Sequence, residues 1–310
     1  MASRTCFVSC VDPTGRPENG AGIARSLRAA FPSVQLVAVI ARTPAPAGID
    51  SVVDRVWEVP TEFSPGSDEH LKRYANEIQK HATAQSLFFS SITKETKALA
   101  RHLAPNSNIL IPPSSALEQA SHPEAVANTP LSMSVPSFCR LQRPDEVLHA
   151  FGRRHDWRVW LRRPERPPIP IPHWTDLRAA RSKTTADPTA GFLQAHREGR
   201  DESIVFSAYQ GELLGAVRVE KSCSDQETMT WTGRLFPVQE ELRSALAQTV
   251  QEMDWTGGAE IQGVRDETGI LWGIDWHPQF PTWIHGPTVR GANLPAALAA
   301  AAWDEPMPSL

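Results

Sequence analysis

The sequence predicts an α/β (α+β) fold, and two regions carry that prediction. Residues 5–41 read as strand, glycine-containing loop, helix and strand, an order that is typical of a βαβ unit in a parallel sheet. Residues 259–276 contain two apolar-alternating runs around a polar turn that ends in Gly269, which predicts a β-hairpin. With 310 residues, the chain is long enough for one large domain or for two to three subdomains.

The N-terminal third predicts a small Rossmann-like sheet. Its βαβ unit has strands at 5–11 and 34–41 and a helix at 23–31, where Ile23, Leu27 and Ala30 have helical spacing. Further short strands are expected at 54–60, 86–90 and 109–111, and further helices at 68–82 and 94–103. The loop glycines (Gly15, Gly20 and Gly22) do not form the G-x-G-x-x-G pattern, which argues against a dinucleotide site.

The remaining elements follow a connecting segment rich in proline: Pro112, Pro113, Pro123, Pro130 and Pro136. After it we expect a helix at 144–153, a strand at 157–162, a helix at 173–180 with Thr175 as N-cap, strands within 192–219 that turn at Gln210–Gly211, and helices at 242–253 and 295–303. Most of the ten tryptophans should lie in the core, although Trp276 and Trp283 could equally form the floor of a substrate pocket.

Composition excludes several classes of function. Thirty-one basic and 35 acidic residues give a net charge of −4, which argues against a nucleic-acid-binding surface. The four cysteines lack the paired spacing of a zinc site and predict free thiols: Cys6, Cys10, Cys139 and Cys223. There is no signal-peptide pattern and no apolar run of about 18 residues, so we expect a soluble, cytoplasmic protein without a membrane partner. The sequence also lacks H-E-x-x-H, G-x-S-x-G and G-x-x-x-x-G-K-[ST] motifs.

The C-terminal hairpin predicts a metal site. Strand alternation places Glu260 and Gln262 on one face, and Asp275 and His277 share a face on the return strand. Oxygen and nitrogen ligands from both strands can therefore converge on a divalent metal that holds polyphosphate. Simpler explanations stay open, since Asp275 can be a polar strand end, His277 a half-buried histidine and Glu260 a solvent-facing residue.

Two motifs in this region resemble a known family. The first is Asp275-Trp276-His277-Pro278-Gln279-Phe280, and the second is Gly291-Ala292-Asn293-Leu294-Pro295. Together they resemble the end of the ATP-grasp domain in carboxylate–amine ligases of the carbamoyl-phosphate-synthetase-like branch, which typically shows Glu-x-Asn-Pro-Arg-Phe followed by Gly-x-Asn-Leu-Pro. Relative to that pattern, His277 replaces an asparagine and Gln279 replaces an arginine. An imidazole suits zinc or manganese better than magnesium.

The resemblance implies an ATP-grasp fold in three parts. These would be a Rossmann-like N-terminal subdomain over residues 1–112, a linker and small lid over 113–190, and a C-terminal antiparallel-sheet subdomain over 191–310.

It also implies where a nucleotide would bind. The family's lysine before proline falls at Arg162 or Arg163, which could also be two solvated arginines. The glycine-rich phosphate loop falls on the proline-rich residues 164–172, which cannot work in the usual way because proline has no N–H. Leu193 and Gln194 would border adenine through their backbone, and Glu202 would lie near the ribose, although a plain antiparallel sheet explains the same pattern.

The missing arginine at position 279 leaves phosphate stabilisation to other cations. Arg162, Arg163 and Arg290 are the candidates for catalysis, and Arg218 and Lys221 are the candidates for nucleotide binding.

By resemblance, the protein is an ATP-dependent ligase of a specialised small-molecule or peptide pathway. It would form an amide or peptide bond through an acyl phosphate, with ATP and Mg²⁺ (or Mn²⁺) as cofactors and a small carboxylate and an amine as substrates. A homodimer stays open. The alternatives are a degenerate ATP-grasp protein that binds a ligand or partner without turnover, and an enzyme that uses the fold for chemistry without ATP.

Overall fold

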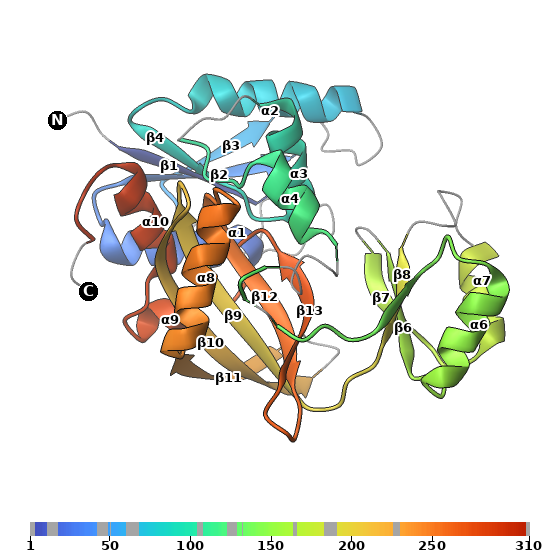
Figure 1. Ribbon diagram of the computed structural model, residues 1–310. Helices are drawn as coiled ribbons and strands as arrows, with labels where there is room; N and C mark the ends of the chain where they lie inside the picture. Colours follow the sequence, from blue (N-terminus) through green and yellow to red (C-terminus); the bar gives the residue numbers. More distant parts are fainter. Residues whose placement is uncertain are drawn as a thin grey trace. The chain divides into compact units, whose positions relative to one another are not determined.

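The structure is a computed structural model, drawn in Figure 1. It describes residues 4–10, 18–41, 49, 51–59, 68–103, 108–122, 129–131, 133–163, 166–182, 191–225 and 230–307. Gly15, Pro123 and the side chain of Cys223, which the sequence singled out, lie outside this part. The chain forms two compact units: unit 1 contains Met1–Ser132, Glu202–Gln262 and Asp275–Leu310, and unit 2 contains Met133–Asp201 and Gly263–Ile274. The predicted subdomain boundaries at residues 112 and 190 stay a prediction.

Sheet A in unit 1 confirms the predicted parallel sheet. Its strands are β1 (Thr5–Ser9), β2 (Gln35–Ala41), β3 (Arg55–Val59) and β4 (Ser86–Phe89), in the order β3-β2-β1-β4 with all pairs parallel. The expected strand at 109–111 is reduced to one parallel bridge between Ile109 and Phe88. The helices of this region are α1 (Glu18–Ala30), α2 (Asp68–His81), α3 (Thr93–His102) and α4 (Ser114–Ala120).

Alternation along these strands fills two cores. Val39 and Phe88 pack with Tyr74 and Leu99 of α2 and α3. Leu36 and its neighbours on the opposite face pack with α1 and with the second sheet of unit 1. Cys6, Cys10 and Cys139 are free thiols, as expected, and burial raises the pKa of Cys10 to about 12.

Sheet B is the second sheet of unit 1, and the tip of its β12–β13 hairpin belongs to unit 2. Its strands are β9 (Arg200–Tyr209), β10 (Glu212–Asp225), β11 (Thr230–Pro237), β12 (Gly257–Arg265) and β13 (Leu271–His277), in the order β11-β10-β9-β12-β13. The predicted turn at Gln210–Gly211 is confirmed, and both residues have positive φ (49° and 76°), as in a type I′ hairpin. The predicted β12–β13 hairpin is also present. Helix α8 (Glu240–Glu252) packs against β10.

Unit 2 contains the third sheet, with the order β5-β8-β6-β7. Its elements are β5 (Phe138–Arg140), α6 (Asp145–Arg154), β6 (Val159–Arg163), β7 (Arg166–Ile171), α7 (Trp174–Ser182) and β8 (Phe192–Ala195). Leu148 of α6 and Leu177 of α7 pack with Leu161 and Leu193 on one face of the sheet. Helix α7 begins at Trp174, so the prediction of Thr175 as N-cap was wrong.

The proline-rich segment forms a strand, not a loop. β7 pairs with β6 at the edge of the sheet, where prolines are tolerated because one side of the strand needs no N–H donors. Arg163 pairs with Arg166, so only residues 164 and 165 connect the two strands.

Helix α1 packs against the C-terminal helices α9 (His285–Val289) and α10 (Leu294–Ala302), as Figure 1 shows for α1 and α10. The Asn293 side chain accepts a hydrogen bond from Ala296 N (3.1 Å), which caps α10, and donates one to Ser26 O (2.7 Å). Thr288 Oγ1 also donates to Ser26 Oγ (2.8 Å). A Cβ at Gly22 would lie 2.7 Å from Thr282 O. Part of the Gly-x-Asn-Leu-Pro motif therefore serves to cap a helix.

None of the helices in the described ranges is long and apolar enough to cross a membrane.

We predict that Gly22→Ala destabilises the protein by about 1–3 kcal/mol, because the new methyl group meets a backbone oxygen that cannot easily move. Urea unfolding of the full chain measures the change. Gly286→Ala is the matched control, since a Cβ there meets no atom within 4 Å and alanine favours a helix by about 1 kcal/mol over glycine. Equal stability of the two variants would contradict this account of the packing.

Candidate active site

The two faces of sheet B carry different charged groups. Register places Ser203 opposite Val219 and Gly233 opposite Lys221, so these side-chain positions share one face, here called the inner face. Glu202 and Arg218 lie on the other face. The predicted nucleotide-binding residues Arg218 and Lys221 therefore point in opposite directions.

A buried ion pair lies on the inner face. Lys221 Nζ donates to Glu260 Oε1 (2.6 Å), and Ser203 Oγ donates to the same oxygen (2.6 Å). The side chains of Lys221 and Glu260 are only 5% and 6% exposed. Burial opposes ionisation of Glu260, but the charge of Lys221 and the hydrogen bonds from Lys221 and Ser203 outweigh it, so the pKa of this carboxyl lies below its ordinary value. Glu260 is thus an ionised strand residue and is not solvent-facing.

Asp275 and His277 lie beside this pair. Trp276 packs on Phe206, which lies on the face opposite Ser203, so alternation places Asp275 and His277 on the inner face. His277 Nε2 lies 3.7 Å from Asp275 Oδ2, and the two side chains are 31% and 42% exposed. Asp275 Oδ1 accepts a hydrogen bond from Trp276 N (2.9 Å). Solvent therefore reaches Asp275 and His277 but hardly reaches Glu260.

This cluster offers few protein ligands to a metal ion. Among the described residues, no three His, Cys, Asp or Glu side chains lie close enough together to hold a metal ion. Both donors to Glu260 contact Oε1, which leaves the lone pairs of Oε2 for another ligand. Gln262 shares the face of Glu260 by strand alternation and is half-buried. Two carboxylates and an amide suit a cation that takes its other ligands from water or phosphate, as Mg²⁺ does.

The outer face of sheet B holds a different pair. Arg218 lies 4.0 Å from the buried Glu202 and its guanidinium lies 4.7 Å from the Phe236 ring centroid. This arrangement fixes both side chains in the sheet, and the proposed ribose contact of Glu202 stays a prediction.

The tryptophans divide as the sequence suggested. Trp276 is 5% exposed and packs on Trp255, with ring centroids 5.2 Å apart, so it belongs to the core. Trp283 is half-buried, and Lys221 Nζ lies 5.5 Å from its ring centroid. Of the two candidates for a pocket floor, only Trp283 lies at the charged cluster.

The altered family position Gln279 and the candidate Arg290 lie in different surroundings. Gln279 Oε1 accepts a hydrogen bond from Thr93 Oγ1 at the start of α3 (2.7 Å). The Gln279 side chain is therefore held by α3, and it brings no positive charge to this position. Arg290 lies in the connection from α9 to α10 and lines a separate pocket, described below.

In unit 2, the sheet separates the two neighbouring arginines. Arg162 Nε donates to Gln194 Oε1 (3.1 Å), and Gln194 is opposite Trp160 in the ladder. This face is opposite the one that α6 and α7 cover, because Leu161 and Leu193 lie in the helix-covered core. Arg163 instead donates to Ala180 O of α7 (2.9 Å). The two side chains lie on opposite faces because neighbouring residues alternate along a strand.

Gln194 is a buried amide with an unused donor. The residue is 1% exposed, and its Nε2 has no hydrogen-bond partner in the described chain. β8 lies between β5 and β6, so the backbone of Leu193 and Gln194 is paired in the sheet on both sides. The side-chain amide of Gln194 is thus the group available to a ligand here, while the side chain of Leu193 is part of the core.

A second buried carboxylate lies at the carboxyl end of sheet A. Glu95 accepts hydrogen bonds from Tyr74 Oη, Ser90 Oγ (2.7 Å) and Ser91 N (3.2 Å). Complete burial raises the pKa of Glu95 despite these donors. Sequence reasoning missed this residue, and it missed Ser203 and Thr93 as well. Of these, Ser203 could have been found from the hairpin register, which places its side chain on the face of Lys221.

Comparison with known proteins identifies the fold. No protein-family model and no curated protein matches this sequence. Among solved structures, the biotin carboxylase domain of Hydrogenobacter thermophilus 2-oxoglutarate carboxylase, in complex with MgADP, ADP and bicarbonate, superposes with a TM-score of 0.67 and 12% identity over 97% of this chain and 70% of that one. Aspergillus clavatus N5-carboxyaminoimidazole synthase, in complex with ADP and 5-aminoimidazole ribonucleotide, gives a TM-score of 0.66 and 14% identity over 99% and 78%. Campylobacter jejuni biotin carboxylase gives a TM-score of 0.65 and 12% identity over 99% and 72%.

These superpositions cover nearly the whole chain and include the parallel sheet A and the two antiparallel sheets. The chain has the ATP-grasp fold.

Proposed function

We propose that the protein is an ATP-dependent ligase that joins a small-molecule carboxylate to an amine, in an amide or peptide bond. The observation that carries the proposal is the polar cluster on the inner face of sheet B, where Lys221 and Glu260 are buried and Asp275 is accessible. The structural neighbours, which bind MgADP or ADP, support a nucleotide as cofactor.

The residues present fit ATP and a divalent metal. Asp275, Glu260 through Oε2, and Gln262 would hold the metal, and His277 would favour Mn²⁺ more than an asparagine does. Lys221 supplies the positive charge for the phosphates. Within unit 2, taken by itself, the unused Nε2 of Gln194 and the neighbouring Trp160 suit a planar, hydrogen-bonding group such as adenine. When bound, ATP with its metal supplies the phosphoryl group that activates a carboxylate.

The chain itself contributes position and charge. Glu260 and Ser203 fix the Lys221 ammonium before any ligand binds, so no reorganisation is needed when negative charge develops nearby. The short distance between Asp275 and His277 keeps both side chains on the same side of the hairpin. Such a site works by orientation more than by proton transfer.

Our proposal includes a cytoplasmic location and leaves a homodimer open. A dimer of the Hydrogenobacter biotin carboxylase domain supports the latter only by analogy.

A second candidate is a protein that binds nucleotide or a partner without turnover. Two observations favour it. Only residues 164 and 165 connect β6 and β7, so a phosphate-covering loop has no room there, and Gln279 brings no charge. Phosphate release in a single turnover, with a mixture of candidate acids and amines, separates the two functions.

We predict that ATP with Mg²⁺ or Mn²⁺ raises the melting temperature of the protein. At a ligand concentration 100 times Kd, the stabilisation is about 2.7 kcal/mol. Asp275→Asn should lose most of the metal-dependent part, whereas Glu267→Gln, an exposed change on the turn of the same hairpin, should not. No shift in the wild type with either metal would contradict the ligase proposal. An unchanged shift in Asp275→Asn would contradict the metal assignment.

Arg162 and Arg163 provide a matched pair of variants. Arg162→Gln should weaken nucleotide binding with little effect on unfolding, because its side chain lies beside Gln194 on the face without helices. Arg163→Gln should lower stability by about 1–3 kcal/mol, because it leaves Ala180 O without its donor, and should leave nucleotide affinity nearly unchanged. Calorimetric titration and urea unfolding measure the two effects. If Arg163→Gln weakened nucleotide binding and Arg162→Gln lowered stability, this assignment of the two arginines would be wrong.

Removing Lys221 should produce a pH-dependent loss of stability. The lowered pKa of Glu260 contributes stability that is present above the ordinary carboxyl pKa and is lost as pH falls through the folded value. In Lys221→Met, the buried carboxylate loses its partner, which costs about 3–5 kcal/mol near pH 7 and less near pH 4.5, where the carboxyl can take up a proton.

Urea unfolding between pH 4.5 and 7.5 tests this. The double variant Lys221→Met/Glu260→Gln removes both charges and should show a smaller penalty that does not change with pH. A single-variant penalty that is equal at both pH values would rule out the buried charge as its cause.

A further inference from the structure

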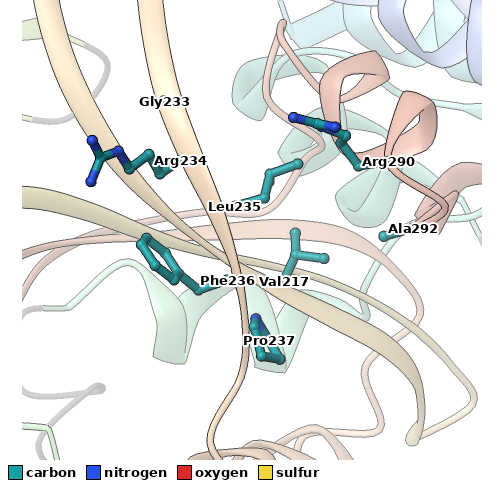
Figure 2. Close-up of a pocket in the computed structure, with 8 residues that line it drawn as sticks. All are labelled: Val217, Gly233, Arg234, Leu235, Phe236, Pro237, Arg290 and Ala292. Carbon is teal, nitrogen blue, oxygen red and sulfur yellow. The ribbon is translucent and has the colours of Figure 1, made fainter.

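An open pocket lies on the inner face of unit 1, and none of the metal candidates is among its lining residues. It has a volume of about 600 Å³, within the usual range for small-molecule sites. Figure 2 shows Val217, Leu235 and Ala292 on one side of β11, with the guanidinium of Arg290 above Leu235. Arg234 and Phe236 point to the other side of the strand, as alternation requires.

The pocket combines an apolar floor with the cation of Arg290; Arg234 also lines it, but its side chain lies on the other side of the strand from Leu235. Val217 is buried in the core, and Leu235 and Ala292 are half-buried against it. Arg290 is exposed, and its guanidinium has no ion pair or hydrogen bond with the described part of the chain. An unpaired guanidinium over apolar side chains suits a ligand that carries both an anionic group and an apolar body.

The pocket adjoins the charged cluster along the sheet. On β10, Val217, Val219 and Lys221 alternate onto the same face, and on β11 Gly233 lines the pocket directly opposite Lys221. Residues directly opposite in a sheet are about 5 Å apart. The Gly233 end of the pocket is therefore next to the Lys221–Glu260 pair, and a ligand in the pocket reaches the edge of the proposed active site.

Charge decides which substrate belongs here. Arg290 repels an ammonium group and attracts a carboxylate, whereas the charge of Lys221 at the other end is already balanced by Glu260. The guanidinium fork matches a carboxylate with two parallel hydrogen bonds.

We infer that this pocket binds a monocarboxylic acid with an apolar body, whose carboxylate is recognised by Arg290. The identification of this acid as a substrate rests on the proposed ligase function, but its binding does not. Arg290, predicted from the sequence as a catalytic cation, is then a recognition residue for the acid.

The experiment titrates the full chain, without ATP, with phenylacetate and 4-methylpentanoate. Phenylacetamide is the neutral counterpart of the first acid, and phenethylamine is the cationic one. Calorimetry or ligand-detected NMR should show the acids bound about 10- to 100-fold more tightly than the amide, and the amine bound most weakly. Arg290→Gln should lower the affinity for the acids to that for the amide and leave the amide unchanged.

Arg243→Gln is the matched control, because it removes an exposed arginine of α8 that does not line the pocket. It should leave acid binding unchanged. Equal binding of acid and amide, equal effects of the two arginine variants, or no binding of any probe would overturn the inference.

ATP titration in the same samples separates this result from the ligase proposal. Nucleotide binding without acid binding overturns only the pocket. Acid binding without nucleotide binding supports the pocket and overturns the role of the acid as a ligase substrate.

Discussion

The packing of α1 against α9 and α10 is the constraint on which the rest of unit 1 depends. Gly22 permits the close approach, and Ser26 and Asn293 join the helices through buried hydrogen bonds. Because these groups are away from water, loss of one partner would leave the other unsatisfied, at a cost of about 1–3 kcal/mol. The contact merges the core of sheet A with the inner face of sheet B into one hydrophobic cluster. It also holds the α9–α10 connection, with Arg290 and Ala292, over β10 and β11.

That packing explains why the charges on the inner face are arranged as they are. A face that is buried at Val217 and Val219 can carry a charge only if the charge is paired, and Lys221 is the next residue in the row. Glu260 of β12, two strands away, pairs with Lys221, and Ser203 of β9, the strand between them, donates to the same carboxylate oxygen. The hydrophobic core therefore ends where the polar cluster begins. Asp275 and His277, one strand further, reach solvent. The gradient from apolar floor to buried pair to accessible carboxylate follows the strand order of one sheet.

The elements that follow from periodicity were predicted from the sequence. The features that depend on contacts with distant segments were missed. The parallel sheet and both hairpins were confirmed, since a period of two along each strand is visible in the chain. β7 was missed because three prolines forbid a central strand, and only its position at the sheet edge makes them acceptable. Arg162 and Arg163 looked equivalent as adjacent cations, yet strand alternation places them on different faces. The Lys221–Glu260 pair joins residues 39 positions apart, and no local pattern reveals that distance.

The proline-rich strand β7 and the uncharged Gln279 have a common consequence for phosphate binding. A loop that covers phosphates excludes water and supplies N–H donors, whereas three of the six residues of β7 are prolines, which have no N–H. A protein that lacks both this loop and a charge at Gln279 must neutralise a bound polyphosphate with cations already fixed in the sheet. Lys221 is such a cation, because Glu260 and Ser203 hold it and its neighbour Trp283 shields it. The buried pair costs desolvation energy that a purely apolar face would not. The chain accepts this desolvation energy where the other family positions offer no charge to a phosphate. The buried charges therefore lie in one row of sheet B, beside the pocket under Arg290.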